Sequence, residues 1–148
     1  MTSLFDILPY LGNYQISFFI LAALSLTLLI QNFLTAPLAF ASKQQEPGMP
    51  LKHDHTNLSF RVIRVFGNSA ENFPAFAGAL LVAIVAGSPP MLVNWLAGVY
   101  FASRMAFWVI YYMGIGKTAG GPRTFAFVGG LLSNIVLAVA AIYAVLSV

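Results

Sequence analysis

The sequence predicts an all-α integral membrane protein whose four transmembrane helices form a bundle. Of its 148 residues, 59% are hydrophobic and 7% are charged, whereas about 25% of a soluble domain is charged. Four long apolar segments alternate with short stretches rich in proline, glycine and polar residues, as expected for membrane spans and their connecting turns. The length allows one compact domain over residues 1–148, and no shift in composition indicates a second.

Composition also excludes several classes of function. The net charge of +3 reflects few acidic residues rather than a basic patch, so we expect no nucleic-acid partner. The absence of cysteine excludes disulfides, thiolate metal sites and a cysteine nucleophile. His53 and His55 flank Asp54 in a loop, but this pair lacks further ligands, so we expect no metal. No basic region precedes the first apolar run, so the N-terminus does not resemble a cleaved signal peptide.

The first span is expected over residues 16–41. Before it, residues 1–15 are mixed and aromatic, which suits a lead-in at the membrane interface. Pro37 is expected to kink or end the helix because it removes a backbone hydrogen bond. The second half of the span carries three further polar residues, Gln31, Asn32 and Thr35. The simpler interpretation is that they join helices through hydrogen bonds, and the alternative is that they line a pocket.

The second span, residues 58–86, carries one continuous polar stripe. At about 100° of rotation per residue, five polar residues fall within an arc of about 100°. They are Arg61, Arg64, Asn68, Glu71 and Asn72. A charged side chain at the bilayer centre costs about 2.5–3.5 kcal/mol, so we expect the stripe to face the bundle interior or a cavity. Pro74 is expected to bend the helix where the stripe ends.

The third span is expected over residues 91–113. Arg104 and Tyr111 are separated by about 20° around this helix, so they share one face. Trp108 and Tyr112 are interpreted as part of an aromatic belt at the membrane interface.

The fourth span is expected over residues 123–147. Gly129 and Ser133 form a small-xxx-small pair, which predicts close packing against another helix.

Four spans place both termini on the same side of the membrane. The basic residues outside the spans gather in the first and third connections, at Lys43, Lys52, Lys117 and Arg123. The positive-inside rule therefore places these two connections in the cytoplasm and the termini on the non-cytoplasmic side. We expect a multi-pass protein of the bacterial inner membrane, or of the endoplasmic reticulum membrane in a eukaryote.

Two spans bring charge to one layer in the cytoplasmic half. The stripe reaches about 15 Å inward from Arg61 to Glu71, because a helix rises about 1.5 Å per residue. Arg104 lies at a similar depth from the cytoplasmic end of the third span. The arginines in this layer outnumber its single glutamate, and buried charges need partners. A small zwitterionic peptide with carboxylates would supply them. The alternatives are an internal salt-bridge network at a subunit interface and an ion pathway of a small transporter or channel.

At these residues the sequence resembles the MAPEG family, the membrane-associated proteins in eicosanoid and glutathione metabolism. The resemblance is carried by the pattern Arg61-x-x-Arg64-x-x-x-Asn68-x-x-Glu71-x-Phe73-Pro74, followed one span later by Arg104 and Tyr111. It implies a homotrimer that binds glutathione, as co-substrate, between neighbouring subunits in the cytosolic half of the membrane. By position, Arg64, Asn68 and Glu71 correspond to glutathione contacts, and Arg61, Asn72, Arg104 and Tyr111 to other members of the binding site.

The resemblance implies a glutathione-dependent transferase or peroxidase that detoxifies hydrophobic or lipid-like electrophiles arriving from the membrane lipid. Arg104 is the first candidate for the cation that activates the thiol, and Arg123 and Lys117 are further candidates. The sequence departs from the best-known enzymes of the family, because Asn72 and Phe107 stand where those enzymes have tyrosines. The alternative function is therefore that of a non-enzymatic lipid-binding or assembly protein of the same fold.

Overall fold

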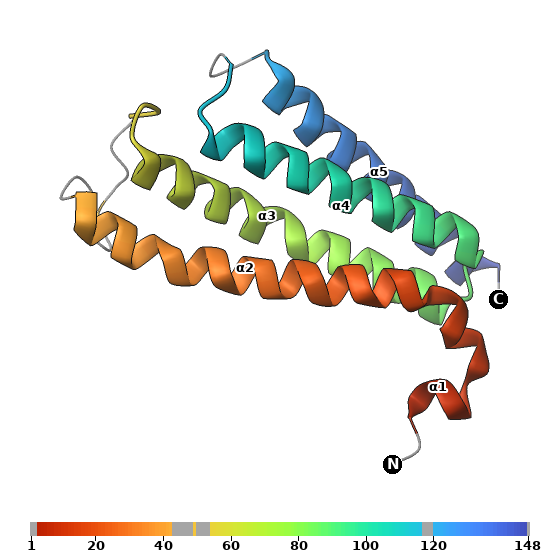
Figure 1. The fold of residues 1–148 in the computed structure, drawn as a ribbon. Helices are drawn as coiled ribbons and strands as arrows, with labels where there is room; N and C mark the ends of the chain where they lie inside the picture. Colours follow the sequence, from red (N-terminus) through yellow and green to blue (C-terminus); the bar gives the residue numbers. More distant parts are fainter. Residues whose placement is uncertain (1–2, 43–48, 50–53, 117–119, 148) are drawn as a thin grey trace.

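The computed structural model describes residues 3–42, 49, 54–116 and 120–147 of the chain. This described part is all-helical, and Figure 1 shows four long helices, each antiparallel to the next, preceded by two short helical segments. In chain order the elements are α1 (Leu4–Ile7), η1 (Pro9–Tyr14), α2 (Gln15–Ser42), α3 (Leu58–Val85), α4 (Pro90–Tyr112) and α5 (Pro122–Leu146). The ends of each long helix lie within one residue of the span expected from the sequence.

Local sequence explains where the later helices begin. Asn57 caps α3, because its side-chain oxygen accepts a hydrogen bond from the backbone N–H of Ser59 at 2.8 Å. Helices α4 and α5 each begin with a proline, whose φ angle is already helical and whose missing N–H needs no partner in a first turn. Gly87 has φ +75° in the turn before α4, a conformation that glycine adopts without strain.

Two prolines lie inside helices without ending them. Helix α2 continues beyond Pro37 to Ser42, and α3 continues beyond Pro74 to Val85. Of the two outcomes expected at Pro37, a kink or a helix end, the helix end is therefore not observed. Membrane helices tolerate an internal proline because neighbouring helices and local adjustments satisfy the freed carbonyl group.

Helices α4 and α5 pack closely over a patch of small residues. A β-carbon placed on Gly130 would lie 3.3 Å from the Cβ of Ser103, and one placed on Gly129 would lie 3.3 Å from its Oγ. Ser133 Oγ, one turn further along α5, donates a hydrogen bond to the carbonyl oxygen of Leu96 at 2.7 Å. The close packing predicted from Gly129 and Ser133 is confirmed.

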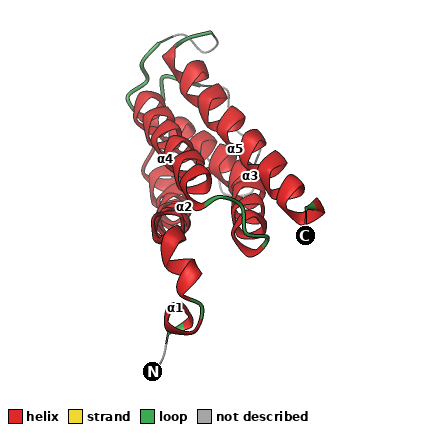
Figure 2. Cartoon of the chain, turned by 90° about the vertical axis from the view of Figure 1, so that its right-hand side faces the viewer, coloured by secondary structure: helices red, strands yellow, loops and turns green. Residues whose placement is uncertain are grey.

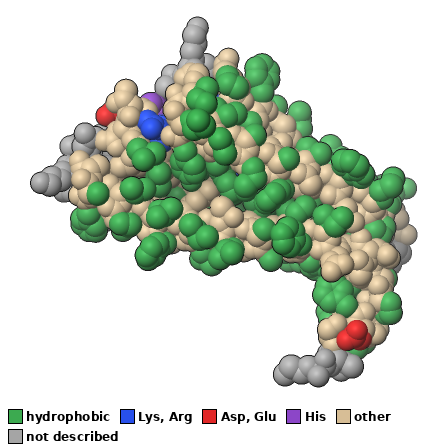
Figure 3. Space-filling view, viewed as in Figure 1, with side chains coloured by type: hydrophobic (Ala, Val, Ile, Leu, Met, Phe, Trp, Pro, Cys, Tyr) green, Lys and Arg blue, Asp and Glu red, His purple; other side chains and the backbone are tan. Residues whose placement is uncertain are grey.

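The surface of the bundle is that of a membrane protein. Large apolar side chains are exposed along all four long helices, and Figure 3 shows them spread over one face of the molecule. In the described chain, three helical segments are long and apolar enough to cross a membrane: Pro9–Ser42, Leu58–Val85 and Pro122–Leu146. Helix α4 is not among them, because Asn94, Arg104 and several aromatic residues with polar groups lower its mean hydropathy. The expectation that α4 also spans the membrane stays a prediction.

Candidate functional site

The polar stripe of α3 lies on the flank of the bundle rather than in its interior. Arg64 and Glu71 are exposed, while Arg61, Asn68 and Asn72 are half-buried. The expectation that the stripe faces the bundle interior is therefore wrong for Arg64 and Glu71, and the alternative, that they face a cavity, stays a prediction. The reason is that the buried face of α3 contains apolar residues such as Val62, Val65 and Phe76. At about 100° per residue, Glu71 lies about 180° from Val62, on the opposite side of the helix.

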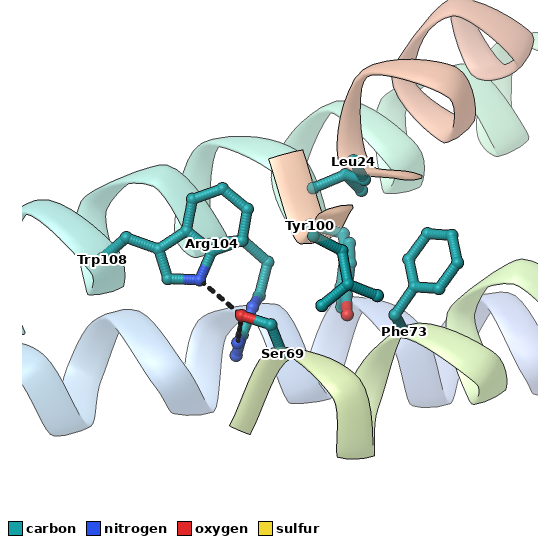
Figure 4. Close-up of a pocket in the computed structure, with 7 residues that line it drawn as sticks. Leu24, Ser69, Phe73, Tyr100, Arg104 and Trp108 are labelled. Carbon is teal, nitrogen blue, oxygen red and sulfur yellow. Dashed lines mark hydrogen bonds between the residues drawn. The ribbon is translucent and has the colours of Figure 1, made fainter. Parts of the chain in front are cut away.

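Arg104 forms the buried centre of the polar layer. Its side chain is 2% exposed. One guanidinium nitrogen, Nη2, donates to Oδ1 of Asn68 at 2.7 Å and lies 3.4 Å from Oγ of Ser69. Trp108 Nε1 donates to the same Ser69 oxygen at 3.0 Å (Figure 4). The prediction that α3 and α4 bring polar groups to one layer is confirmed by these contacts.

These contacts also correct one expectation. Trp108 is 5% exposed and belongs to the core, so it is not part of an interfacial belt. Its indole packs inside because Ser69 gives the N–H a buried partner. No ion pair of Glu71 is found among the described residues. The guanidinium of Arg104 instead has neutral oxygens as its partners.

The interior beside Arg104 has room for a water molecule but not for a peptide. A cavity of about 10 Å³ lies there, lined by Leu24, Leu28, Ser69, Phe73, Tyr100, Arg104 and Trp108 (Figure 4). A volume of about 10–15 Å³ on this measure holds one water. This cavity is therefore too small for a ligand of peptide size.

Arg61 holds the end of the bundle together. Its Nε donates to the carbonyl oxygen of Tyr112 at 3.2 Å. Its Nη1 donates to the carbonyl oxygens of His55 and Thr56 at 2.9 and 2.8 Å. Gly114, which has φ +68°, lies against the guanidinium and leaves room for it. Arg61 thus joins the start of α3 to the end of α4 and supports the site through the backbone.

Tyr111 connects this end of the bundle to α5. Its hydroxyl lies 3.5 Å from Nδ1 of His55, and the guanidinium carbon of Arg123 lies 4.3 Å above its ring. Phe107 packs edge-on against the same ring, at 5.5 Å between centroids, and also lies 4.9 Å from the guanidinium carbon of Arg104. One face of α4 therefore links the two candidate activating arginines. The arrangement is a chain of cation–π and aromatic contacts.

The turn that carries His55 is shaped by Asp54. Its Oδ1 accepts hydrogen bonds from Oγ1 and the backbone N–H of Thr56, at 2.6 and 3.0 Å. These hydrogen bonds favour the ionised carboxylate and lower the pKa of Asp54 below its usual range. Among the described residues, no cluster of three or more potential metal ligands is found. His53 and the three lysines at 43, 52 and 117 lie outside the described residues.

The polar residues of α2 do not join helices as expected. Asn32 is exposed, and Thr35 Oγ1 donates to the carbonyl oxygen of Asn32 in its own helix. Gln31 is 3% exposed, and within the described chain neither of its side-chain polar atoms has a hydrogen-bond partner. It shares a face of α2 with Leu24 and Leu28, which line the cavity beside Arg104.

The sequence analysis did not predict the role of Ser69, whose Oγ accepts hydrogen bonds from both Arg104 and Trp108. Ser69 lies on the same buried arc of α3 as Val62 and Val65. A hydroxyl on this otherwise apolar face was the sequence feature that could have predicted a hydrogen bond between helices.

Comparison with known proteins identifies the family. The model of the MAPEG family matches residues 17–143, from the first turn of α2 to the last turns of α5, and so includes every candidate site residue. In a comparison with curated proteins, none matches the chain. The match covers far more than half of the sequence, and the chain belongs to the MAPEG family.

Proposed function

We propose that this protein is a glutathione-dependent transferase or peroxidase of the membrane that acts on hydrophobic or lipid-like electrophiles. Glutathione, its co-substrate, binds between neighbouring copies of a homotrimer. Membership of the MAPEG family supports a glutathione-related function at the membrane. The observation that carries the proposal is the exposed pair Arg64 and Glu71, for which no hydrogen bond or ion pair is found within the described chain.

Exposed charges on the flank of a membrane helix need partners from outside the subunit. Charged residues inside a membrane cost several kcal/mol unless they are paired or hydrated. A neighbouring copy that covers this flank, together with a zwitterionic peptide, would provide such partners. A carboxylate of glutathione suits the planar guanidinium of Arg64. Its ammonium group suits Glu71, and the half-buried amides of Asn68 and Asn72 lie on the same side of α3.

Bound glutathione supplies a thiol, which attacks as the thiolate. A cation near the sulfur favours this ionised form. The two candidates for this cation, Arg104 and Arg123, differ in exposure. Arg123 is the better supported of the two, since it is half-buried at the end of the bundle and lies over Tyr111. Arg104 is enclosed, and its hydrogen bond to Asn68 suits a positioning residue that orients the amide. In conjugation, a carbon–sulfur bond forms, the leaving group departs with its electron pair, and the thiol proton passes to solvent.

The site lies in the cytoplasmic half of the membrane under this proposal. The termini then lie on the non-cytoplasmic side, and the connections α2–α3 and α4–α5 lie in the cytoplasm. Figure 1 is consistent with this arrangement, because the end of α2, the start of α3, the end of α4 and the start of α5 lie together, away from the start of α2 and the end of α5. The membrane is the bacterial inner membrane, or that of the endoplasmic reticulum if the source is eukaryotic.

A second function, lipid binding or assembly without catalysis, is favoured by one observation. Asn72 donates its side-chain N–H to the backbone carbonyl of Asn68 at 2.8 Å, and Phe107 presents only a ring to Arg104. Both positions lack the tyrosine hydroxyls of the family's best-known enzymes. A conjugation assay with glutathione and a generic aryl halide separates the two functions. Ion flux in liposomes tests the transporter alternative.

Calorimetric titration of glutathione tests the binding site. Arg64→Ala should weaken affinity at least about tenfold, because removing one partner of a buried charged hydrogen bond costs about 2–5 kcal/mol. Asp6→Asn is the matched control, since it removes a charge far from the site and should leave affinity unchanged. Equal affinities for the wild type and a trimeric Arg64→Ala would contradict the site.

A further inference from the structure

The N-terminal segment leaves the bundle as a hook. Elements α1 and η1 turn away from the direction of α2, and α1 projects beyond the end of the bundle (Figures 1 and 2). This N-terminal hook, residues 3–14, exposes five large apolar side chains: Leu4, Phe5, Ile7, Leu8 and Tyr10. Leu4 is 60% exposed and Ile7 is 64% exposed. The only charged residue in the hook is Asp6.

The hook is held in place by specific contacts. At its junction with α2, the Tyr14 hydroxyl donates to the backbone carbonyl of Ser88. Asn94 Nδ2 donates to the backbone carbonyl of Asn13 at 2.8 Å. Nearer the tip, the ring of Phe5 packs edge-on against the ring of Phe18 in α2, with centroids 5.6 Å apart. The direction in which the hook leaves the bundle is therefore fixed by the fold.

The tip of the hook is also ordered by its own sequence. Ser3 and Asp6 form a reciprocal capping box, in which each side chain accepts a hydrogen bond from the other's backbone N–H. This capping places a carboxylate at the start of α1 and leaves the neighbouring apolar side chains exposed. The single turn of α1 is thus amphipathic.

The length of α2 places the hook at a membrane surface. Helix α2 has 28 residues, so it is about 42 Å long at about 1.5 Å per residue. A bilayer is about 40–45 Å thick with its headgroups. The apolar segment that can cross a membrane begins at Pro9, so α1, which precedes it, lies at the boundary of the membrane. Cover by lipid would stabilise the five exposed apolar side chains there, since apolar surface in water costs about 25 cal/mol per Å².

We propose that the N-terminal hook binds the lipid interface, lying between the headgroups and the acyl chains of the leaflet where the chain begins. Leu4 and Ile7 insert into the apolar boundary, and Asp6 remains in the headgroup region. The hook has no Lys or Arg, so its binding is apolar and needs no anionic lipid. Through the contacts of Tyr14 and Asn13, the bound hook fixes the depth at which the whole bundle sits.

Spin labels on single cysteines test this proposal, because the chain has no native cysteine. Leu4→Cys and Ile7→Cys carry the label in the full chain, reconstituted in phosphatidylcholine bilayers. Met49→Cys, exposed in the connection between α2 and α3 and outside every helix, is the control. Collision with oxygen, which dissolves in lipid, is compared with collision with a water-soluble nickel chelate. The two hook labels should lie about 5–10 Å below the headgroup surface, and the control label should lie in water.

Two further outcomes would overturn the proposal. Hook labels that collide with the nickel chelate as often as the Met49→Cys label would show that the hook is in water. Hook labels shielded from both reagents would show that it packs against a neighbouring copy of the chain. Leu4→Cys serves as an independent site if the Ile7→Cys variant does not fold. High salt should leave the depth unchanged, whereas a loss of depth would indicate electrostatic binding.

Discussion

The two ends of the bundle use polar residues in opposite ways. Near the termini, Asn94 Oδ1 accepts hydrogen bonds from the hydroxyl and the backbone N–H of Ser17, at 2.6 and 3.2 Å. Its Nδ2 donates to the carbonyl oxygen of Asn13. Between the other end and the middle of α3, Arg64 and Glu71 are exposed on the flank, and the described chain offers the side chain of neither a hydrogen-bonded partner.

The difference separates polar groups that stabilise from polar groups that bind. A neutral network whose members are all paired within the chain joins helices and needs no ligand. Charges without partners inside a subunit have a free-energy cost in a membrane, which a neighbouring copy or a ligand can relieve. Arg104 lies between the two cases, since it is buried and hydrogen-bonded but has no carboxylate partner in the part of the chain that is described.

The largest expected effect is on the recognition of the ligand's ammonium group. The wild type should bind glutathione at least about tenfold more tightly than N-acetylglutathione, because loss of a buried charged partner costs about 2–5 kcal/mol. Glu71→Ala should bind both ligands with the same weak affinity, as measured by calorimetric titration. Thermal unfolding should change little, since Glu71 is exposed. If Glu71→Ala still prefers glutathione, Glu71 does not bind the ammonium group.

The next effect concerns ionisation of the thiol. If Arg123 lies near the sulfur, it lowers the pKa of the bound thiol, and each unit corresponds to about 1.4 kcal/mol. Arg123→Met should remove the ultraviolet absorbance of the thiolate at saturating glutathione. Arg104→Met is the comparison: it should weaken binding through Asn68 but keep the absorbance of the ligand that remains bound. The reverse pattern would return the activating role to Arg104.

The smallest effect of the three lies at the end near the termini. Asn94→Leu leaves the buried Ser17 hydroxyl without its partner and should lower the free energy of unfolding by about 1–3 kcal/mol. Glutathione affinity should not change. Asn32→Leu is the matched control, because Asn32 is exposed, and it should cause little loss. Denaturation monitored by circular dichroism measures both variants. Equal stability of Asn94→Leu and the wild type would contradict a stabilising role for this network.

The helices were predictable from the sequence because their signals are local. Apolar periodicity and turn residues place each helix end to within one residue. The small-residue pair Gly129 and Ser133 also predicted packing correctly, since small side chains permit close approach wherever they occur in a membrane helix.

The orientation of the site was not predictable in the same way. A helical projection groups Arg64, Asn68 and Glu71 on one arc, but it does not say whether that arc faces the same subunit or another. Packing of Val62 and Val65 decides this, and it turns the arc outward. The position of Trp108 depends on Ser69, a partner 39 residues away in the chain, so its amphipathic side chain alone could not distinguish core from interface. The prediction that Gln31 joins helices through hydrogen bonds was wrong for the same reason. Whether a buried side chain finds a partner depends on the packed bundle and not on the local sequence.

Native mass spectrometry of the protein in lipid nanodiscs, with and without glutathione, tests most directly whether the charged flank is a site shared between copies. We expect a trimer that binds up to three glutathione molecules, and an Arg64→Ala trimer that binds none at the same concentration. A stable monomer that binds glutathione as well as the trimer does would contradict the account, because the site would then be complete within one chain.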